Sequence, residues 1–229
     1  MVDITRSVYD TIRQGGLALV PTTAGYGLLA MRAAAVERLY QVKGRPPGRP
    51  CVTVATWPIF DAIAAGVDPA HRAWAEQIAR EHPLALVTRF DAAAVPIARM
   101  EAGALERCTK DGTLASFHRA GALVCGVAEL AFADGELVVG SSANASGAGN
   151  SHQLDEVPEQ IRAAADVTVD QGRTPLAHLG RAATTILDLT TGTFLRRGLQ
   201  FEAIAQRWER VGAPLRGAGH PSVAEVPVR

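Results

Sequence analysis

The chain has 229 residues, of which 48% are hydrophobic, enough to bury the core of one large domain or of two small ones. Its 23 basic and 23 acidic side chains cancel, which argues against a dedicated nucleic-acid-binding protein. Three widely spaced cysteines, Cys51, Cys108 and Cys125, are typical of a reducing cytoplasm, and neither they nor the histidines are spaced as metal ligands. We therefore expect a cytoplasmic protein with no metal site.

Apolar periodicity and breaker residues predict alternating helices and strands. Helices are expected at residues 7–14, 33–41, 57–65, 69–81, 157–165 and 201–211. Strands are expected at residues 17–20, 52–55, 84–88, 137–139, 167–170 and 185–189, while 122–131 fit a helix or a strand. This alternation predicts an α/β fold. Residues 1–211 are expected to form one domain and residues 212–229, rich in Pro and Gly, an extended C-terminal tail. The charged first residues indicate neither a signal peptide nor a membrane span.

The first candidate segment follows the strand predicted at residues 17–20. The apolar run ends at Pro21 and is followed by a turn rich in hydroxyl groups and glycine, from Thr22 to Leu29. Tyr26 stands between two glycines, where it would form either the wall of a small pocket or ordinary core.

The second candidate segment carries three cations within seven positions. Lys43, Arg45 and Arg49 alternate with glycines and prolines, so we expect a stiff loop rather than a solvated helix face. Arg grips a phosphate in a bidentate fork and Lys supplies a compact charge, a combination that favours a polyphosphate or a carboxylated ligand. The alternative is a basic surface loop without a partner.

The third candidate segment, residues 141–147, follows a buried-looking strand. It gathers small hydroxyl and amide side chains, including Ser141, Ser142 and Asn144, into one tight turn. Small residues let backbone N–H groups approach an anion or a nucleotide, although Ser and Asn also satisfy their own backbone in ordinary turns. We expect the three segments to line one common hollow.

Five short motifs in this order resemble the YrdC-type family, which includes the threonylcarbamoyl-adenylate synthases of tRNA modification. The motifs are Pro21-Thr22 with Tyr26-Gly27-Leu28, then Lys43-x-Arg45-Pro46 with Pro50, Ser142-Ala143-Asn144-x-Ser146-Gly147, Thr184-Thr185-Ile186-Leu187-Asp188, and Leu195-Arg196-x-Gly198. The resemblance spans about residues 8–204. It implies a single-domain, twisted mixed sheet with flanking helices around a basic cavity.

The resemblance implies that bicarbonate, L-threonine and ATP are joined to give threonylcarbamoyl-AMP and pyrophosphate. The threonylcarbamoyl-AMP is then used by another enzyme, which modifies an adenosine in tRNA. A tRNA or a tRNA-modification protein is the implied macromolecular partner. Mg²⁺ is expected with the triphosphate, held by phosphate oxygens and water, so no carboxylate cage need appear in the sequence.

Site residues carried over from the family divide into three groups. Lys43 and Arg45 are implied as catalytic residues that hold the phosphates and the carboxylated intermediate. The implied nucleotide-binding residues are Arg49, Ser141, Ser142, Asn144 and Arg196. The implied amino-acid-binding residues are Thr22, Thr23, Tyr26 and Thr184.

One departure from the family pattern affects the amino-acid half of the site. The segment Gly112-Thr113-Leu114-Ala115-Ser116-Phe117 resembles a family strand in which an Arg meets the amino-acid carboxylate, but Phe117 stands in its place. On a strand His118 would point to the opposite face, whereas Arg119 would share the face of Phe117 further along. The chain therefore resembles a divergent member whose nucleotide half is the better preserved.

Two other interpretations stay open. The chain could be a paralogue that binds a nucleotide or RNA, including double-stranded RNA, without this reaction, because a fold does not fix a function. It could also be a synthase with another amino-acid acceptor, or a carbamoyl-transfer component that depends on a partner protein.

Overall fold

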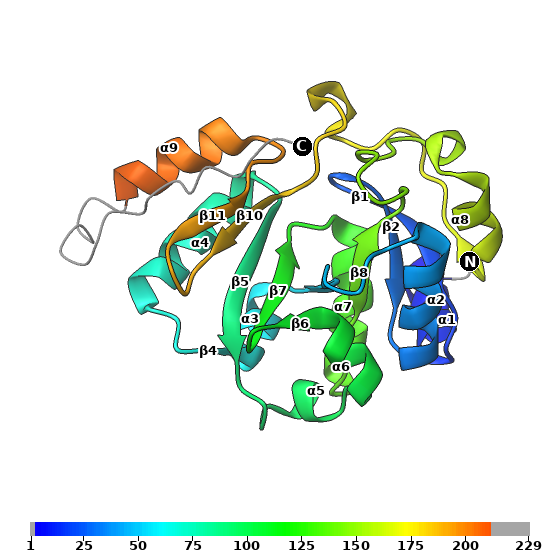
Figure 1. The fold of residues 1–229 in the computed structure, drawn as a ribbon, viewed down its shortest axis with the longest axis horizontal. Helices are drawn as coiled ribbons and strands as arrows, with labels where there is room; N and C mark the ends of the chain where they lie inside the picture. The colour runs from blue at the N-terminus through cyan, green and yellow to red at the C-terminus, as the bar shows by residue number, and fades with distance from the viewer. Residues whose placement is uncertain (1–2, 212–229) are drawn as a thin grey trace.

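The structure is a computed structural model, and it describes residues 3–211. The tail predicted at residues 212–229 lies outside the described residues. Figure 1 shows one mixed sheet with helices around it. The helices are α1 (Ile4–Arg13), α2 (Ala33–Lys43), α3 (Trp57–Ile63), α4 (Pro69–Glu81), α5 (Val95–Ala98), α6 (Ala102–Cys108), α7 (Ala122–Ala133), α8 (Glu159–Ala164) and α9 (Phe201–Val211), with 3-10 turns at Leu154–Glu156 and Ala177–Leu179.

Eleven described strands form the sheet. They are β1 (Ala18–Thr22), β2 (Gly25–Ala30), β3 (Val52–Val54), β4 (Ala64–Ala65), β5 (Leu84–Phe90), β6 (Thr109–Lys110), β7 (Thr113–His118), β8 (Val139–Ser142), β9 (Val167–Thr168), β10 (Thr185–Asp188) and β11 (Thr193–Arg196). Their order is β11-β10-β5-β7-β3-β8-β2-β1-β9, while β4 pairs with β5 and β6 with β7. The pairs β1–β9, β3–β7 and β5–β10 are parallel and the others antiparallel, so the expected mixed α/β sheet is confirmed.

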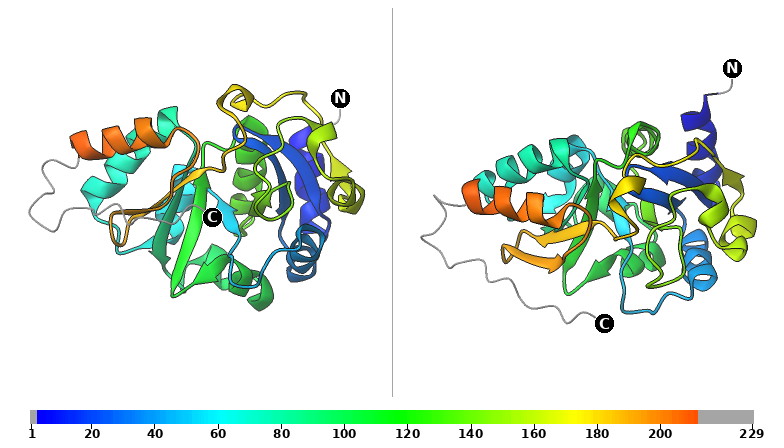
Figure 2. Two further views of the ribbon diagram at one scale, coloured as in Figure 1. Left: turned by 45° about the horizontal axis from the view of Figure 1, so that its top comes forward. Right: turned by 90° about the horizontal axis from the view of Figure 1, so that it is seen from above.

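The helices gather at both ends of the sheet and behind it. Helices α4 and α9 pack together at one end, and α1, α2 and α8 lie at the other, as the view from above shows (Figure 2). Helix α7 packs between α1 and the central strands. Within residues 3–211 no helix has both the length and the apolar character needed to cross a membrane.

Strand β7 shows how the two faces of the sheet differ. Ser116 and His118 are almost fully buried, and the His118 ring stacks on Trp57 of α3 at a centroid distance of 4.5 Å. Phe117 points to the opposite face because side chains alternate along a strand, and it is only half-buried. Since His118 faces α3, Phe117 lies on the face of β7 turned away from α3, which we call the open face. Figure 1 shows no helix in front of β5 and β7.

Several predicted elements agree with the structure, and others differ in local detail, among them residues 64–65, predicted as the end of a helix but found in strand β4. Helices α4 and α9 have the predicted bounds, and residues 122–131 form a helix. The turn predicted from Thr22 to Leu29 is present but confined to Thr23 and Ala24, and strand β2, whose residues are all buried, follows it. Gly25 follows this turn with a φ of 138° and also permits close approach, because a Cβ there would lie 2.9 Å from the Ser151 carbonyl oxygen.

Two further corrections concern the basic loop and the serine-rich turn. Lys43 is the last residue of α2, since Gly44 adopts a left-handed conformation (φ 55°) and ends the helix there. Ser141 and Ser142 are the last residues of β8 and pair with Leu28 and Gly27, so the turn itself begins after them.

Candidate functional site

The end of α2 is tied to the end of β8 through Lys43. The Lys43 side chain is 3% exposed. Its ammonium donates to the carbonyl oxygen of Ser142, to that of Asn144 at 2.6 Å and to the Asn144 side-chain oxygen at 3.4 Å. An ammonium has three N–H donors, so these oxygens account for all of them. Lys43 thus fixes the turn after β8 from inside the protein.

Burial and a neighbouring cation act on the Lys43 ammonium. Desolvation, followed by the positive charge of Arg45, lowers the pKa of Lys43 to about 7. The three oxygen acceptors favour the charged form and oppose this shift. The protonation state of Lys43 therefore depends on the backbone and side-chain oxygens that accept its hydrogen bonds.

Arg45 holds the loop that follows α2. Its guanidinium donates to the Arg49 carbonyl oxygen at 2.8 Å, to the Pro50 carbonyl oxygen at 2.6 Å and to the Ser141 hydroxyl at 3.0 Å. The guanidinium also lies over the Tyr40 ring, 5.6 Å from its centroid. Arg45 is half-buried and two of its five N–H donors remain unused in these contacts.

Two further arginines add exposed positive charge beside Arg45. Arg49 makes a single side-chain contact, from a guanidinium nitrogen to the Ser146 hydroxyl at 3.4 Å. Arg196, at the end of β11, donates through Nε to the Thr184 carbonyl oxygen at 2.7 Å. Surrounding protein and then the charges of Arg45 and Arg49 lower the pKa of Arg196 to about 10.

Two properties of Arg196 differ in how far they place its side chain from solvent. Its side chain is exposed to solvent, yet desolvation is the largest cause of its lowered pKa. Since Arg45 and Arg49 are close enough to act on it, the three guanidiniums form one cationic cluster, which we call the arginine cluster.

The residues predicted to bind the amino acid fall into two groups, according to whether their hydroxyl groups already form hydrogen bonds within the protein. Thr22 donates to the Gly25 carbonyl oxygen at 2.6 Å and accepts from the Ala24 N–H at 3.1 Å. Tyr26, 1% exposed, donates to Asp170 at 2.6 Å, and burial with this bond raises its pKa to about 12. These two residues build the fold.

The other two predicted threonines keep their hydroxyl groups available. Within residues 3–211, the hydroxyl groups of Thr23 and Thr184 form no hydrogen bond, and both residues are half-buried. Thr23 uses only its backbone N–H, which donates to the Ala120 carbonyl oxygen at 3.0 Å. Either hydroxyl could therefore still bind a ligand.

Polar residues after the serine-rich turn hold the site together, and the sequence analysis did not assign them. The Asn150 amide donates to the carbonyl oxygens of Ala24 at 2.7 Å and Ala182 at 3.1 Å. His152 lies between the Thr174 hydroxyl at 2.7 Å and the Gly180 carbonyl oxygen at 2.8 Å. The run Gly149-Asn150-Ser151-His152, which begins two residues after the motif ending at Gly147, was the available signal.

The three candidate segments contact one another, and the common hollow expected among them stays a prediction. The Ala143 N–H donates to the Tyr26 carbonyl oxygen at 2.8 Å, which joins the turn after β8 to β2, while Lys43 and Arg45 join it to the basic loop. The ligand roles assigned to these residues remain predictions.

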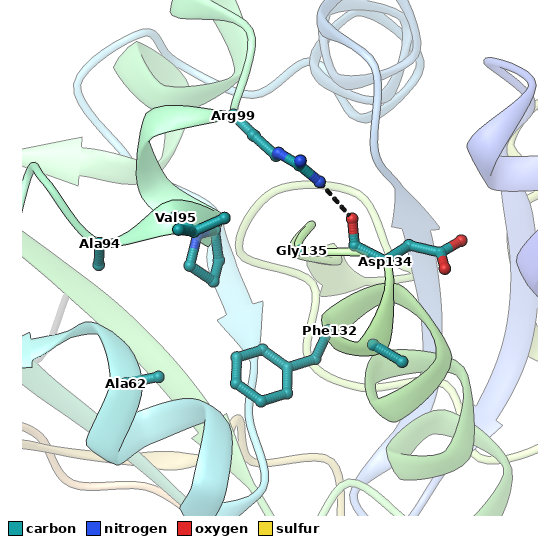
Figure 3. A pocket seen from close by; sticks show the side chains of 9 residues that line it. Ala62, Ala94, Val95, Arg99, Phe132, Asp134 and Gly135 are labelled. Carbon is teal, nitrogen blue, oxygen red and sulfur yellow. Dashed lines mark hydrogen bonds between the residues drawn. The ribbon is translucent and has the colours of Figure 1, made fainter.

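The two described pockets lie elsewhere. One, of about 500 Å³, opens between α3, α5 and α7, where Arg99 donates to the Asp134 carbonyl oxygen at 2.7 Å (Figure 3). The other, of about 520 Å³, is lined by residues around the start of α9, including Arg197 and Phe201. The arginine cluster lines neither of these two pockets. In the described part of the chain no group of three His, Cys, Asp or Glu side chains is placed to hold a metal ion.

Comparison with known proteins gives a family and a fold. The Sua5/YciO/YrdC family model, described as telomere recombination, matches residues 10–198. A search of curated proteins found no significant match. A hypothetical protein, smu.1377c, from Streptococcus mutans superposes with a TM-score of 0.76 at 18% identity, over 90% of each chain. E. coli YciO gives a TM-score of 0.63 at 18% identity, over 85% of this chain and 88% of the other.

A solved relative with a bound amino acid is also similar. P. abyssi Sua5 complexed with L-threonine gives a TM-score of 0.69 at 25% identity, over 100% of this chain and 65% of that one. The chain therefore spans about two thirds of the length of that Sua5. The matched residues and the shared sheet establish that the chain belongs to the Sua5/YciO/YrdC family.

Proposed function

We propose that this protein is an ATP-dependent synthase of a carbamoyl-adenylate. Its reaction would join bicarbonate, an amino acid and ATP, release pyrophosphate, and with L-threonine give threonylcarbamoyl-AMP for tRNA modification. The observation that carries the proposal is the arginine cluster beside the turn that Lys43 fixes.

The charge distribution suits a triphosphate. The positive charges of Arg45 and Arg49 act unfavourably on that of Arg196, and an anion bound beside them would relieve this repulsion. Arg196 uses one N–H donor in the protein, so most of its donors are free for phosphate oxygens, and the exposed Arg49 adds positive charge beside it. In adenylation negative charge moves onto the leaving pyrophosphate, and cations already in place stabilise it without reorganisation.

Lys43 and Arg45 would have a different part in this reaction from the exposed arginines. Because the Lys43 ammonium is engaged by three oxygens, we assign it the positioning of the Ser142 and Asn144 backbone for the nucleotide. Arg45 would position the loop and offer its two remaining donors to phosphate. The triphosphate would bring its own Mg²⁺, held by phosphate oxygens and water, which fits a site without a carboxylate cluster among residues 3–211.

The acceptor is proposed to be an amino acid. A Sua5 of the same family, 25% identical to this chain, binds L-threonine. Thr23 and Thr184, with hydroxyl groups free of protein partners in the described residues, would contact it here. A tRNA or a tRNA-modification protein would be the downstream partner, and the cytoplasm, where three unpaired cysteines stay reduced, the location.

A second function is favoured by one observation. Phe117 is half-buried on the open face of β7 and carries no charge where the family resemblance implies an Arg. A paralogue that binds a nucleotide or RNA, and does not react with an amino acid, would not need a positive charge at this position.

Pyrophosphate release separates the two functions. The protein is incubated with ATP, Mg²⁺, labelled bicarbonate and a panel of amino acids. The synthase predicts release that requires bicarbonate and one amino acid, with the label recovered in an adenylate. Nucleotide binding without release, with every amino acid tested, would contradict the synthase and favour the binding paralogue.

A further inference from the structure

The central strands bury one face of the sheet and leave the other partly exposed. His118, Leu84 and Thr185 are paired across β7, β5 and β10, and none of them is more than 2% exposed. The side chains that alternate with them along the same strands lie on the open face. Three apolar residues on this face are only half-buried, namely Phe117, Val87 and Ile186.

The half-buried side chains join through two alanines into one apolar patch. Phe117 is paired with Ala85, and Ala85 with Ile186, so these three side chains form one row across the strands. Ala115 and Val87 are paired with each other in the next row. We call these residues the apolar patch. The face of a sheet that is turned to solvent commonly carries polar side chains, so a contiguous apolar patch there indicates a binding surface.

The apolar patch adjoins the arginine cluster. Ile186 of β10 is paired with Arg196 of β11, so a guanidinium that we propose to bind phosphate extends the row that begins at Phe117. Thr184, whose hydroxyl group forms no hydrogen bond within residues 3–211, lies two residues before Ile186. The arrangement complements a molecule that joins an apolar group to a phosphate.

The dimensions of the apolar patch favour a small molecule over a protein partner. Adjacent strands lie about 4.8 Å apart, and side chains two positions apart on a strand are separated by about 7 Å, so the patch spans about 10 Å by 7 Å. A stable protein interface buries about 800 Å² on each partner, roughly ten times this area. One branched or aromatic amino-acid side chain would cover the patch.

We infer that the apolar patch binds the side chain of the acceptor, which is an amino acid with a branched or aromatic apolar side chain rather than L-threonine. Phe117 would be the specificity-determining residue, because its ring supplies the largest apolar surface of the patch. A hydroxyl group laid on the patch would lose its hydrogen bonds to water without gaining others, which disfavours a threonine side chain. The inference rests on the proposed function, since it names the class of acceptor for the same site.

A comparison of L-valine with L-threonine tests the inference, because the two have the same shape and differ by a methyl group in place of a hydroxyl group. Pyrophosphate release is measured with ATP, Mg²⁺, bicarbonate and each of L-valine, L-leucine, L-phenylalanine, L-threonine and L-serine. We expect kcat/KM to be at least about tenfold higher for L-valine than for L-threonine, as is typical when an apolar surface meets an unpaired hydroxyl group.

Two substitutions separate specificity from folding. Phe117→Ala removes the ring, so the ratio of kcat/KM for L-leucine to that for L-threonine should fall at least about tenfold. Val95→Ala is the control, because Val95 of α5 is an apolar residue that is 57% exposed and lies outside the patch, and this variant should keep the wild-type ratio. A ratio compares two acceptors in the same sample, so partial unfolding of a variant does not change it.

Calorimetric binding of the same amino acids, without ATP, distinguishes failure of the inference from failure of the synthase. Release that is fastest with L-threonine, or an equal ratio in the wild type and Phe117→Ala, would overturn the inference and leave the synthase standing. Binding of L-leucine that Phe117→Ala weakens, without pyrophosphate release, would support the inference and refute the synthase. A wild type that neither binds nor turns over any of these amino acids would refute both.

Discussion

Replacing either of two neighbouring arginines by lysine should have unequal effects. Arg45 makes three hydrogen bonds that fan out from its planar guanidinium to Arg49, Pro50 and Ser141. A lysine keeps the charge, but its single nitrogen cannot span acceptors placed around a guanidinium. At least two bonds would be lost, at about 1 kcal/mol net each.

A loss of about 2 kcal/mol would weaken ATP binding about 30-fold if the ordered loop is needed for it. Arg49, by contrast, makes one contact of 3.4 Å and is exposed, so Arg49→Lys should change ATP affinity by less than about threefold. The assay is titration of ATP with Mg²⁺ into wild type, Arg45→Lys and Arg49→Lys, with melting temperatures measured alongside. Equal affinities in the two variants would refute the idea that Arg45 positions the loop while Arg49 supplies only charge.

Three further substitutions test the assigned roles of buried groups. The pKa of Lys43 in the folded protein is lowered to about 7, so between about pH 7 and 10 the unfolded chain binds more protons than the folded one. Urea unfolding should therefore show the wild type gaining stability relative to Lys43→Met as pH rises through this window. A constant difference in stability would contradict the assignment. Burial lowers the pKa of His118 to about 3, so the free energy of unfolding of the wild type should fall by up to about 1.4 kcal/mol per pH unit below pH 6.5. The His118→Phe variant should lose less stability over the same range. An equal pH dependence of stability in the two proteins, measured by urea unfolding, would be the contrary result. Tyr26→Phe removes the bond to Asp170 and should cost about 1 kcal/mol of stability with no change in amino-acid affinity, and a weakened affinity at full stability would return Tyr26 to the ligand site.

Helix boundaries were predictable where a local signal fixes them. Asp68 accepts hydrogen bonds from the N–H groups of Ala70 and His71, and Pro69 follows it, so both the cap and the first turn of α4 are encoded within a few residues. Strand β2 was not predictable in the same way. Its glycines are typical of a turn. A side chain at Gly25 would clash with residues 150–151, which are distant in the sequence, so no local pattern explains this glycine.

The meeting of the candidate segments was predictable from their motifs, but the use of each side chain was not. Lys43 finds its acceptors about a hundred positions away, in Ser142 and Asn144. Tyr26 finds Asp170 in the same way. Hydrogen-bond partners that are distant in the sequence determine whether a polar group stabilises the fold or is available to a ligand. No local sequence pattern predicts these partners.

Hydrogen exchange with and without ATP and Mg²⁺ tests the central claim, a single nucleotide site built from distant segments, most directly. The account predicts slower exchange on ATP binding in residues 43–50, 141–147 and 184–197 together, because one ligand would contact all three. Protection of none of them, or protection confined to the pockets beside α5 and α9, would contradict it.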